Sequence, residues 1–172
     1  EGLRVMSKDA CRPFSANRNG MVQGEGAAIY VLENFDNARK RGAEILAEVI
    51  GYAMSSDASD IVMPSKQGAA RAIKGALIDA QLNSEEVQYI NAHGTGTAAN
   101  DKTECAAVAD VFGKHADNLM ISSTKSSLLS TSFLHEGTTK FQFLLIFRIS
   151  NPSFVRITST ILSSISTPVS FF

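Results

Sequence analysis

The sequence predicts an α/β fold in which strands and helices alternate along one layered sheet. Short β-prone runs at residues 45–52, 87–91 and 119–122 are separated by stretches whose apolar residues recur at helical spacing. Apolar residues make up 44% of the chain and charged residues 19%, a balance typical of a globular domain. Strands that alternate with helices in this way favour a sheet covered by helices.

Length and charge narrow the classes of function. With 172 residues the chain is long enough for one ordinary domain, and its formal net charge of −1 argues against binding to nucleic acid. Two cysteines, Cys11 and Cys105, are too few for a disulfide framework, so we expect a cytoplasmic protein in a reducing compartment. Because Glu1 is not an initiator methionine and no leader follows it, we interpret the chain as a fragment.

The first elements expected are two strands joined by a short helix. Residues 26–32 are almost continuously apolar and predict a strand. Asp36 can cap a short helix that stops at Gly42, and residues 45–52 predict the second strand. We expect these two strands to pair as a hairpin or as an edge pair.

A longer amphipathic helix is predicted next, followed by a strand that carries a histidine at its end. Ser65 can cap a helix that runs to about Leu82. Residues 87–91 then predict a strand, with His93 just beyond its carboxyl end, where open α/β sheets place their ligands. The apolar stripe of the helix consists of Ala69, Ala72, Ile73, Ala76, Leu77 and Ala80.

The last helix and strand of this alternating region follow directly. Asn100 can cap a helix that Gly113 ends, with Asp101 and Glu104 in the first turn, where the helix dipole favours acidic side chains. Residues 119–122 predict a further strand. The inner face of the helix is expected to consist of Cys105, Val108 and Phe112.

Composition changes abruptly near Ser126. Beyond it the chain has no alanine or aspartate, and it holds seven of the ten phenylalanines. The run 141–147 predicts either a short strand or a buried turn of helix, and the uncharged run 157–172 is too short and polar for a membrane span. We hypothesise that residues 127–172 are an atypical tail that is not native sequence, for example the product of a frameshift. An intact in-frame tail in related genes would contradict this.

The turn after residues 87–91 allows two interpretations. In the first, Gly94, Gly96 and Ala99 have the spacing of a dinucleotide-binding turn. Two features weaken this interpretation. The strand at 119–122 does not end in the acidic residue that holds a ribose, and threonines crowd a turn in which pyrophosphate must approach bare backbone.

The second interpretation groups His93, Thr95, Thr97 and Lys125 into one site. If the two strands that precede them are parallel, His93 and Lys125 lie at one edge of the sheet. A neutral imidazole N–H can stabilise a negatively charged carbonyl oxygen, and threonine hydroxyls can bind an amide-rich arm. Spacing alone leaves a plainer alternative open, in which His93 is a hydrogen-bonded turn residue and Lys125 is solvated. Neither cysteine has an activating base beside it in sequence, so structural roles are expected for both.

Five segments form a recognisable set when taken together. They are Cys11–Phe14, Asn17–Gly26, Asn91–Thr97, Asn100–Asp101 and Ser122–Ser126. In this order they resemble the elongating β-ketoacyl-[acyl carrier protein] synthases. Within that family the chain is most similar to the nodulation-associated members. The resemblance covers roughly residues 3–126, so it stops where the composition changes.

The resemblance implies a thiolase-like fold made of two similar halves. Residues 1–60 then form the end of the N-terminal half and residues 61–126 the start of the C-terminal half. The implied activity is an acyltransfer in fatty acid synthesis or in the synthesis of a nodulation-factor acyl chain. A malonyl group on acyl carrier protein is decarboxylated and condenses with an acyl thioester. No cofactor and no metal is implied. The implied partners are acyl carrier protein and, for the full-length parent, a second subunit of a homodimer.

The resemblance assigns roles to particular residues of this chain. His93 and Lys125 match the catalytic histidine and lysine that support decarboxylation, and Thr95 and Thr97 match the threonines that contact the phosphopantetheine arm. Ser130 stands where the family has its second histidine, and neither cysteine matches the acyl-accepting one. The chain alone is therefore expected to be inactive. Two other classes stay open: a non-catalytic partner subunit that determines chain length, and a nucleotide-binding α/β module.

Overall fold

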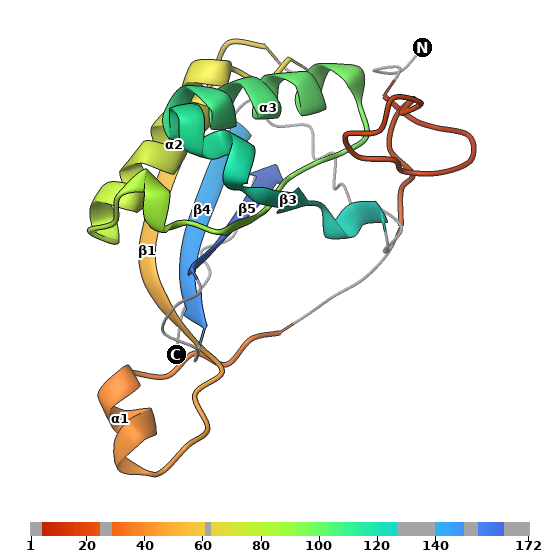
Figure 1. Cartoon of the computed structure of the whole chain (residues 1–172). Coiled ribbons are helices and arrows are strands. Elements are labelled where there is room, and N and C mark those ends of the chain that lie inside the picture. Colours follow the sequence, from red (N-terminus) through yellow and green to blue (C-terminus); the bar gives the residue numbers. More distant parts are fainter. Residues whose placement is uncertain (1–4, 25–28, 61–62, 127–139, 150–154, 164–172) are drawn as a thin grey trace.

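A five-stranded mixed sheet forms the centre of the structure (Figure 1). The computed structural model describes residues 5–24, 29–60, 63–126, 140–149 and 155–163. The elements are α1 (Phe35–Lys40), β1 (Ala47–Ser56), α2 (Lys66–Asp79), β2 (Tyr89–Asn91), α3 (Ala98–Phe112), β3 (Met120–Ser122), β4 (Lys140–Ile149) and β5 (Val155–Ser163), with short 3₁₀ turns at Ser84–Glu86, Gly113–Asn118 and Thr124–Ser126.

The strands lie in the order β1-β4-β5-β2-β3. β2 is parallel to β3 on one side and to β5 on the other, whereas β4 is antiparallel to both β1 and β5. Helices α2 and α3 pack against each other above the sheet, and α1 stands apart from them at the far end of β1 (Figure 1). Within the described ranges, no helix is long and apolar enough to cross a membrane.

The predicted alternation of helices and strands in the middle of the chain is confirmed. Ser65 is the N-cap of α2, and its hydroxyl accepts a hydrogen bond from the N–H of Gly68 at 3.1 Å. The helix ends at Asp79, a few residues before the predicted end, because Gln81 adopts a positive φ of 56° that breaks the helical path. β2 and β3 are each slightly shorter than predicted, and they are parallel, as expected.

The predicted strand at 26–32 and its pairing with the next strand are wrong. Residues 25–28 lie outside the described residues, and residues 29–32 form no strand. Ile29 and Val31 are each 93% exposed. β1 begins two residues later than predicted and pairs with β4 instead. A strand needs a neighbour for its backbone N–H and C=O groups, and no described strand lies beside residues 29–32.

Two helix caps also differ from the prediction. Asn34 caps α1, and its Oδ1 accepts hydrogen bonds from the N–H groups of Asp36 and Asn37 at 3.0 and 3.3 Å. Thr97, not Asn100, caps α3, so the N–H of Asn100 donates to the Thr97 hydroxyl at 3.2 Å. Asp36 and Asn100 thus lie inside the first turn of their helices, because an earlier residue already supplies the capping oxygen.

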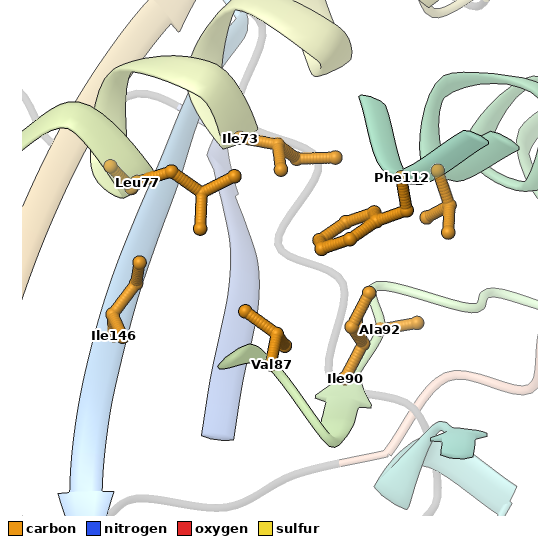
Figure 2. Close-up of a cluster of buried hydrophobic side chains, with 9 residues drawn as sticks. Ile73, Leu77, Val87, Ile90, Ala92, Phe112 and Ile146 are labelled. Carbon is orange, nitrogen blue, oxygen red and sulfur yellow. The ribbon is translucent and has the colours of Figure 1, made fainter. Parts of the chain in front are cut away.

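The hydrophobic core lies between the two packed helices and the sheet (Figure 2). Leu77 of α2 points toward Ile146 and Val87 (Figure 2). Ile73 of the same helix points toward Phe112 of α3, which packs over Ile90 and Ala92 (Figure 2). The predicted stripe of α2 is therefore confirmed at its centre. The buried residues of this cluster are Ile73, Ala76, Leu77, Val87, Ile90, Ala92, Val108, Phe112 and Ile146.

Cys105 does not belong to the inner face of α3, contrary to the prediction. Val108 and Phe112 are buried as expected, but Cys105 is exposed. At 100° per residue, Glu104 lies near the middle of the buried stripe and Cys105 at its margin. The buried side of α3 also includes the polar residues Asn100 and Asp101 of its first turn, and this side faces the glycine turn that precedes the helix.

The composition change near Ser126 is followed by two strands. Of the two predictions for residues 141–147, the strand is confirmed, since they form most of β4. Ile146 has no exposed surface and joins the core. The uncharged run 157–172 contributes to β5 up to Ser163, and residues 164–172 lie outside the described residues, as do 127–139. The hypothesis that the tail is not native sequence stays a prediction.

Candidate active site

His93 and Lys125 follow neighbouring parallel strands. His93 lies two residues after β2 and Lys125 three residues after β3. The two strand ends stay joined beyond the last paired residues: the N–H of Ala92 donates to the carbonyl oxygen of Ser122 at 2.7 Å. The predicted arrangement of both side chains at one edge of the sheet follows from this register.

Glu104 holds the turn that contains His93. One carboxylate oxygen accepts from the N–H of His93 at 2.8 Å, and the other from the N–H of Gly94 at 2.9 Å. The side-chain amide of Asn100 donates to the same carboxylate at 3.4 Å. Charge-assisted hydrogen bonds of this kind are stronger than neutral ones, so the backbone that carries His93 is anchored to α3.

Asp101 is the most deeply buried charged residue in this region, with 1% of its surface exposed. Its Oδ1 accepts from the N–H of Gly96 at 3.2 Å, and its Oδ2 accepts from the N–H of Phe14 at 2.7 Å. The guanidinium of Arg18 lies 3.8 Å away. Asp101 therefore ties α3, the glycine turn and the segment around Phe14 together, and these partners offset the cost of burying its charge.

The segment that precedes Met21 packs directly on the glycine turn. The thiol of Cys11 donates to the carbonyl oxygen of Thr95 at 3.2 Å, and the N–H of Gly20 donates to the carbonyl oxygen of Gly96 at 2.9 Å. Gly96 has a φ of +76°, and a Cβ on it would lie 2.8 Å from the carbonyl oxygen of Gly20. A glycine is therefore required here by both conformation and space.

Thr95 and Thr97 point their hydroxyls toward each other. The two Oγ1 atoms lie 2.9 Å apart, and both residues are buried. The Thr97 hydroxyl also accepts from the N–H of Asn100 as the helix cap, while that of Thr95 accepts weakly from the N–H of Thr97 at 3.4 Å. Because a pair of hydroxyls shares one proton in such a contact, the second hydroxyl proton is left for another acceptor.

Lys125 is half-buried in the middle of the 3₁₀ turn that follows β3. Burial lowers its pKa below the ordinary value, because desolvation disfavours the ammonium form. The charges of Glu104 and Cys11 have the opposite effect and raise the pKa of Lys125. Lys125 is thus coupled electrostatically to Glu104 and to Cys11. Glu104 in turn accepts a hydrogen bond from the backbone N–H of His93.

The cysteines have environments that fit structural roles. Burial raises the pKa of the Cys11 thiol, and Asp101 raises it further, against an opposing effect of Lys125. Desolvation by the neighbouring atoms raises the pKa of Cys105, and the negative charges of Glu104 and Asp101 raise it further. A raised thiol pKa reduces the thiolate that a nucleophile requires. In the part of the chain that the structure describes, no cluster of three or more His, Cys, Asp or Glu side chains could hold a metal ion.

Sequence reasoning placed Asp101 and Glu104 only as acidic residues in a helix start, and it missed that they bind the backbone of the turn. It also missed Ser123, whose hydroxyl contacts the carbonyl oxygens of His93 and Gly94 at 3.2 and 2.9 Å. One signal was present: acidic residues follow a glycine-rich turn by a few positions, so their carboxylates can reach back to its N–H groups.

Comparison with known proteins identifies the family. Residues 46–130 match the family model described as the C-terminal domain of β-ketoacyl synthases. Over 126 residues the chain is 56% identical to nodulation protein E of Rhizobium leguminosarum bv. trifolii, which covers 73% of this chain and 31% of that protein. Over 119 residues it is 51% identical to 3-oxoacyl-[acyl-carrier-protein] synthase 2 of Synechocystis sp., which covers 68% and 29%.

A solved structure shows the same fold. It contains a type II polyketide acyl carrier protein in complex with its ketosynthase, which is bound to the hexaketide. That structure and this chain are 43% identical with a TM-score of 0.65, over 68% of this chain and 29% of that chain. The chain spans about a third of the length of the curated relatives it matches. These matches, with the histidine and lysine that follow neighbouring parallel strands, show that the chain belongs to the β-ketoacyl synthase family and has the thiolase-like fold of its C-terminal domain.

Proposed function

We propose that this chain is part of a β-ketoacyl-[acyl carrier protein] synthase, an acyltransferase of fatty acid synthesis. The observation that carries the proposal is the placement of His93 and Lys125 after neighbouring parallel strands, in a chain 56% identical to nodulation protein E over 126 residues. In the proposed reaction the malonyl group loses carbon dioxide. The resulting enolate then attacks the carbonyl carbon of an acyl thioester, and the thiolate leaves. The 56% identity supports the finer proposal that the acyl chain belongs to a nodulation factor.

His93 and Lys125 are the proposed catalytic residues. An imidazole N–H from His93 stabilises the negative charge that develops on the thioester oxygen when carbon dioxide leaves. The backbone N–H of His93 donates a hydrogen bond to the carboxylate of Glu104, which holds the residue in place. Little reorganisation is then needed when the charge develops. Lys125 is half-buried, where a positive charge acts more strongly on an anion than it does in bulk water.

Thr95 and Thr97 are proposed to bind the phosphopantetheine arm of acyl carrier protein. Their paired hydroxyls leave one O–H for an amide carbonyl oxygen of the arm. The ketosynthase of the solved structure is bound to its acyl carrier protein, which supports the same partner for the parent of this chain. We also propose that the parent is a cytoplasmic homodimer, and that residues 1–60 and 61–126 belong to its two similar halves.

The geometry of the glycine turn argues against the nucleotide-binding alternative. The N–H groups of Gly94 and Gly96 donate to the carboxylates of Glu104 and Asp101. A phosphate would have to displace these carboxylates and would approach two negative charges. Binding of NAD or ATP by the chain, lost on Gly96→Ala, would revive that alternative.

The chain alone is proposed to be inactive. Both cysteines have raised pKa values and neither matches the acyl-accepting position of the family. Condensation of malonyl-carrier by the purified 172-residue chain would contradict this. A parent gene that lacks the acyl-accepting cysteine would instead favour the partner subunit that determines chain length.

The test of the proposed function uses the full-length parent with acyl carrier protein. The assay follows loss of carbon dioxide from malonyl-carrier and formation of the condensed product by mass spectrometry. His93→Ala and Lys125→Ala are expected to lower the rate of decarboxylation at least about 100-fold, the usual scale for a positioned proton donor or charge. Lys102→Ala, on the exposed side of α3, is the matched control and is expected to leave the rate unchanged.

A further inference from the structure

Ser123 joins the two strand ends that carry His93 and Lys125. Its side chain is buried, and its hydroxyl proton is shared between the carbonyl oxygens of His93 at 3.2 Å and Gly94 at 2.9 Å. The same oxygen accepts a weak hydrogen bond from the N–H of Lys125 at 3.4 Å. One hydroxyl thus contacts the backbone of both candidate catalytic residues.

The fit of Ser123 against the turn depends on Gly94. Gly94 has a φ of +41°, and a Cβ on it would lie 2.5 Å from the Cβ of Ser123 and 2.9 Å from the ring of Phe14. A side chain at position 94 would push the strand ends apart. Because Gly94 has no side chain, Ser123 can reach both carbonyl oxygens. The close contact between Gly94 and Ser123 also limits how far apart the two strand ends can lie.

Ser123 also begins the short turn that carries Lys125. The N–H and hydroxyl of Ser126 both donate to the carbonyl oxygen of Ser123, at 3.4 and 3.0 Å. Ser123 therefore holds the position of Lys125 in two ways. Its carbonyl oxygen accepts the hydrogen bonds that close the turn, and its hydroxyl binds the turn to the backbone of His93 and Gly94. Only the hydroxyl makes the second connection.

We propose that Ser123 is a positioning residue, whose hydroxyl fixes the distance between the turn that carries His93 and the turn that carries Lys125. This role rests on the proposed function, because it matters for catalysis only if those two residues act together. In this role Ser123 acts through the backbone of the two turns that it joins. It acts by keeping Lys125 in its half-buried position beside Glu104.

The test compares Ser123→Ala with Ser126→Ala in the 172-residue chain by NMR spectroscopy. In Ser123→Ala the carbonyl ¹³C resonance of Gly94 is expected to move upfield, because the hydrogen bond is lost. The pKa of Lys125 is expected to rise toward that of an exposed lysine, since a loosened turn lets solvent reach the ammonium. Ser126→Ala removes a hydrogen bond from the same turn without touching the His93 turn, and is expected to leave both signals unchanged.

Two further variants keep a hydrogen-bond donor at position 123. Ser123→Thr keeps the hydroxyl and is expected to restore both signals. If Ser123→Ala does not fold, Ser123→Cys, with a weaker donor of similar size, is expected to shift both signals part of the way. An unchanged pKa of Lys125 in a folded Ser123→Ala chain would overturn the proposal, and so would equal changes in Ser126→Ala. Neither readout requires activity, so failure of the condensation assay would overturn the proposed function and leave this result standing.

Discussion

Residues 29–32 and the β2 region are both apolar and β-prone in sequence, yet they end in opposite environments. Ile29 and Val31 are each 93% exposed, whereas Val87 and Ile90 are packed under Ile73, Leu77 and Phe112. The difference is one of partners: β2 has a parallel strand on each side and a helix pair above it. An apolar run therefore predicts a strand only where the rest of the chain supplies neighbours.

The largest expected effect is the loss of a core side chain. Ile146→Ala is expected to lower the free energy of unfolding by about 2–5 kcal/mol, because it leaves a cavity beside Leu77 and Val87. Ile29→Ala removes the same atoms from an exposed site and is expected to change it by less than about 0.5 kcal/mol. Chemical denaturation of both variants measures the difference. Equal effects would show that β4 does not pack as described.

The second-largest effect is expected from the loss of a buried carboxylate, compared with the loss of one at the surface. Asp101→Ala is expected to cost about 2–3 kcal/mol of unfolding free energy, because the N–H groups of Phe14 and Gly96 lose their acceptor while buried. Asp110→Ala serves as the control, since Asp110 is a partly exposed carboxylate that pairs with Lys66 and Lys74 on the surface. The control is expected to change stability much less. A cost for Asp110→Ala as large as for Asp101→Ala would contradict this ranking.

The next prediction concerns the N-caps of two helices, the packed helix α3 and the exposed helix α1. Thr97→Ala is expected to cost about 1 kcal/mol, because the N–H of Asn100 loses its capping oxygen in a packed helix. Thr97→Ser keeps the oxygen and should restore stability. Asn34→Ala removes the cap of α1, a short exposed helix, and is expected to have a smaller effect on global unfolding. Thermal or chemical unfolding measures both, and a larger loss for Asn34→Ala would refute the comparison.

The smallest expected change is electrostatic. The negative charge of Glu104 raises the pKa of Lys125 against the effect of burial, so Glu104→Gln is expected to lower that pKa further. NMR titration of the lysine signals measures it, with the exposed Glu44→Gln as control. Because burial lowers the pKa of Lys125 below its unfolded value, the unfolded chain binds more protons between the two values and stability rises with pH there. Glu104→Gln should extend that window to lower pH, and a raised pKa in the variant would contradict the assignment.

Sequence patterns predicted the parts of the fold that depend on local spacing. Ser65 and the stripe around Ile73 and Leu77 identify α2, and the crossover rule places His93 and Lys125 at one edge. Thr97 was missed as a cap because Asn100 has an equally good capping side chain, and only the path of the glycine turn decides between them. The insertion of β4 and β5 between β1 and β2 was missed because strand order depends on contacts far apart in sequence.

The strand order has a consequence for synthesis of the chain. β1 and β2 are not neighbours in the sheet; the β4–β5 hairpin lies between them. During translation, residues 47–126 emerge before the strands that join them, so α2, α3 and the β2–β3 pair must wait with one edge of β2 open. An open edge is where chains associate wrongly. β4 and β5 therefore close the sheet once they have been synthesised, and a delay in their synthesis lengthens the time for which the nascent chain needs a chaperone.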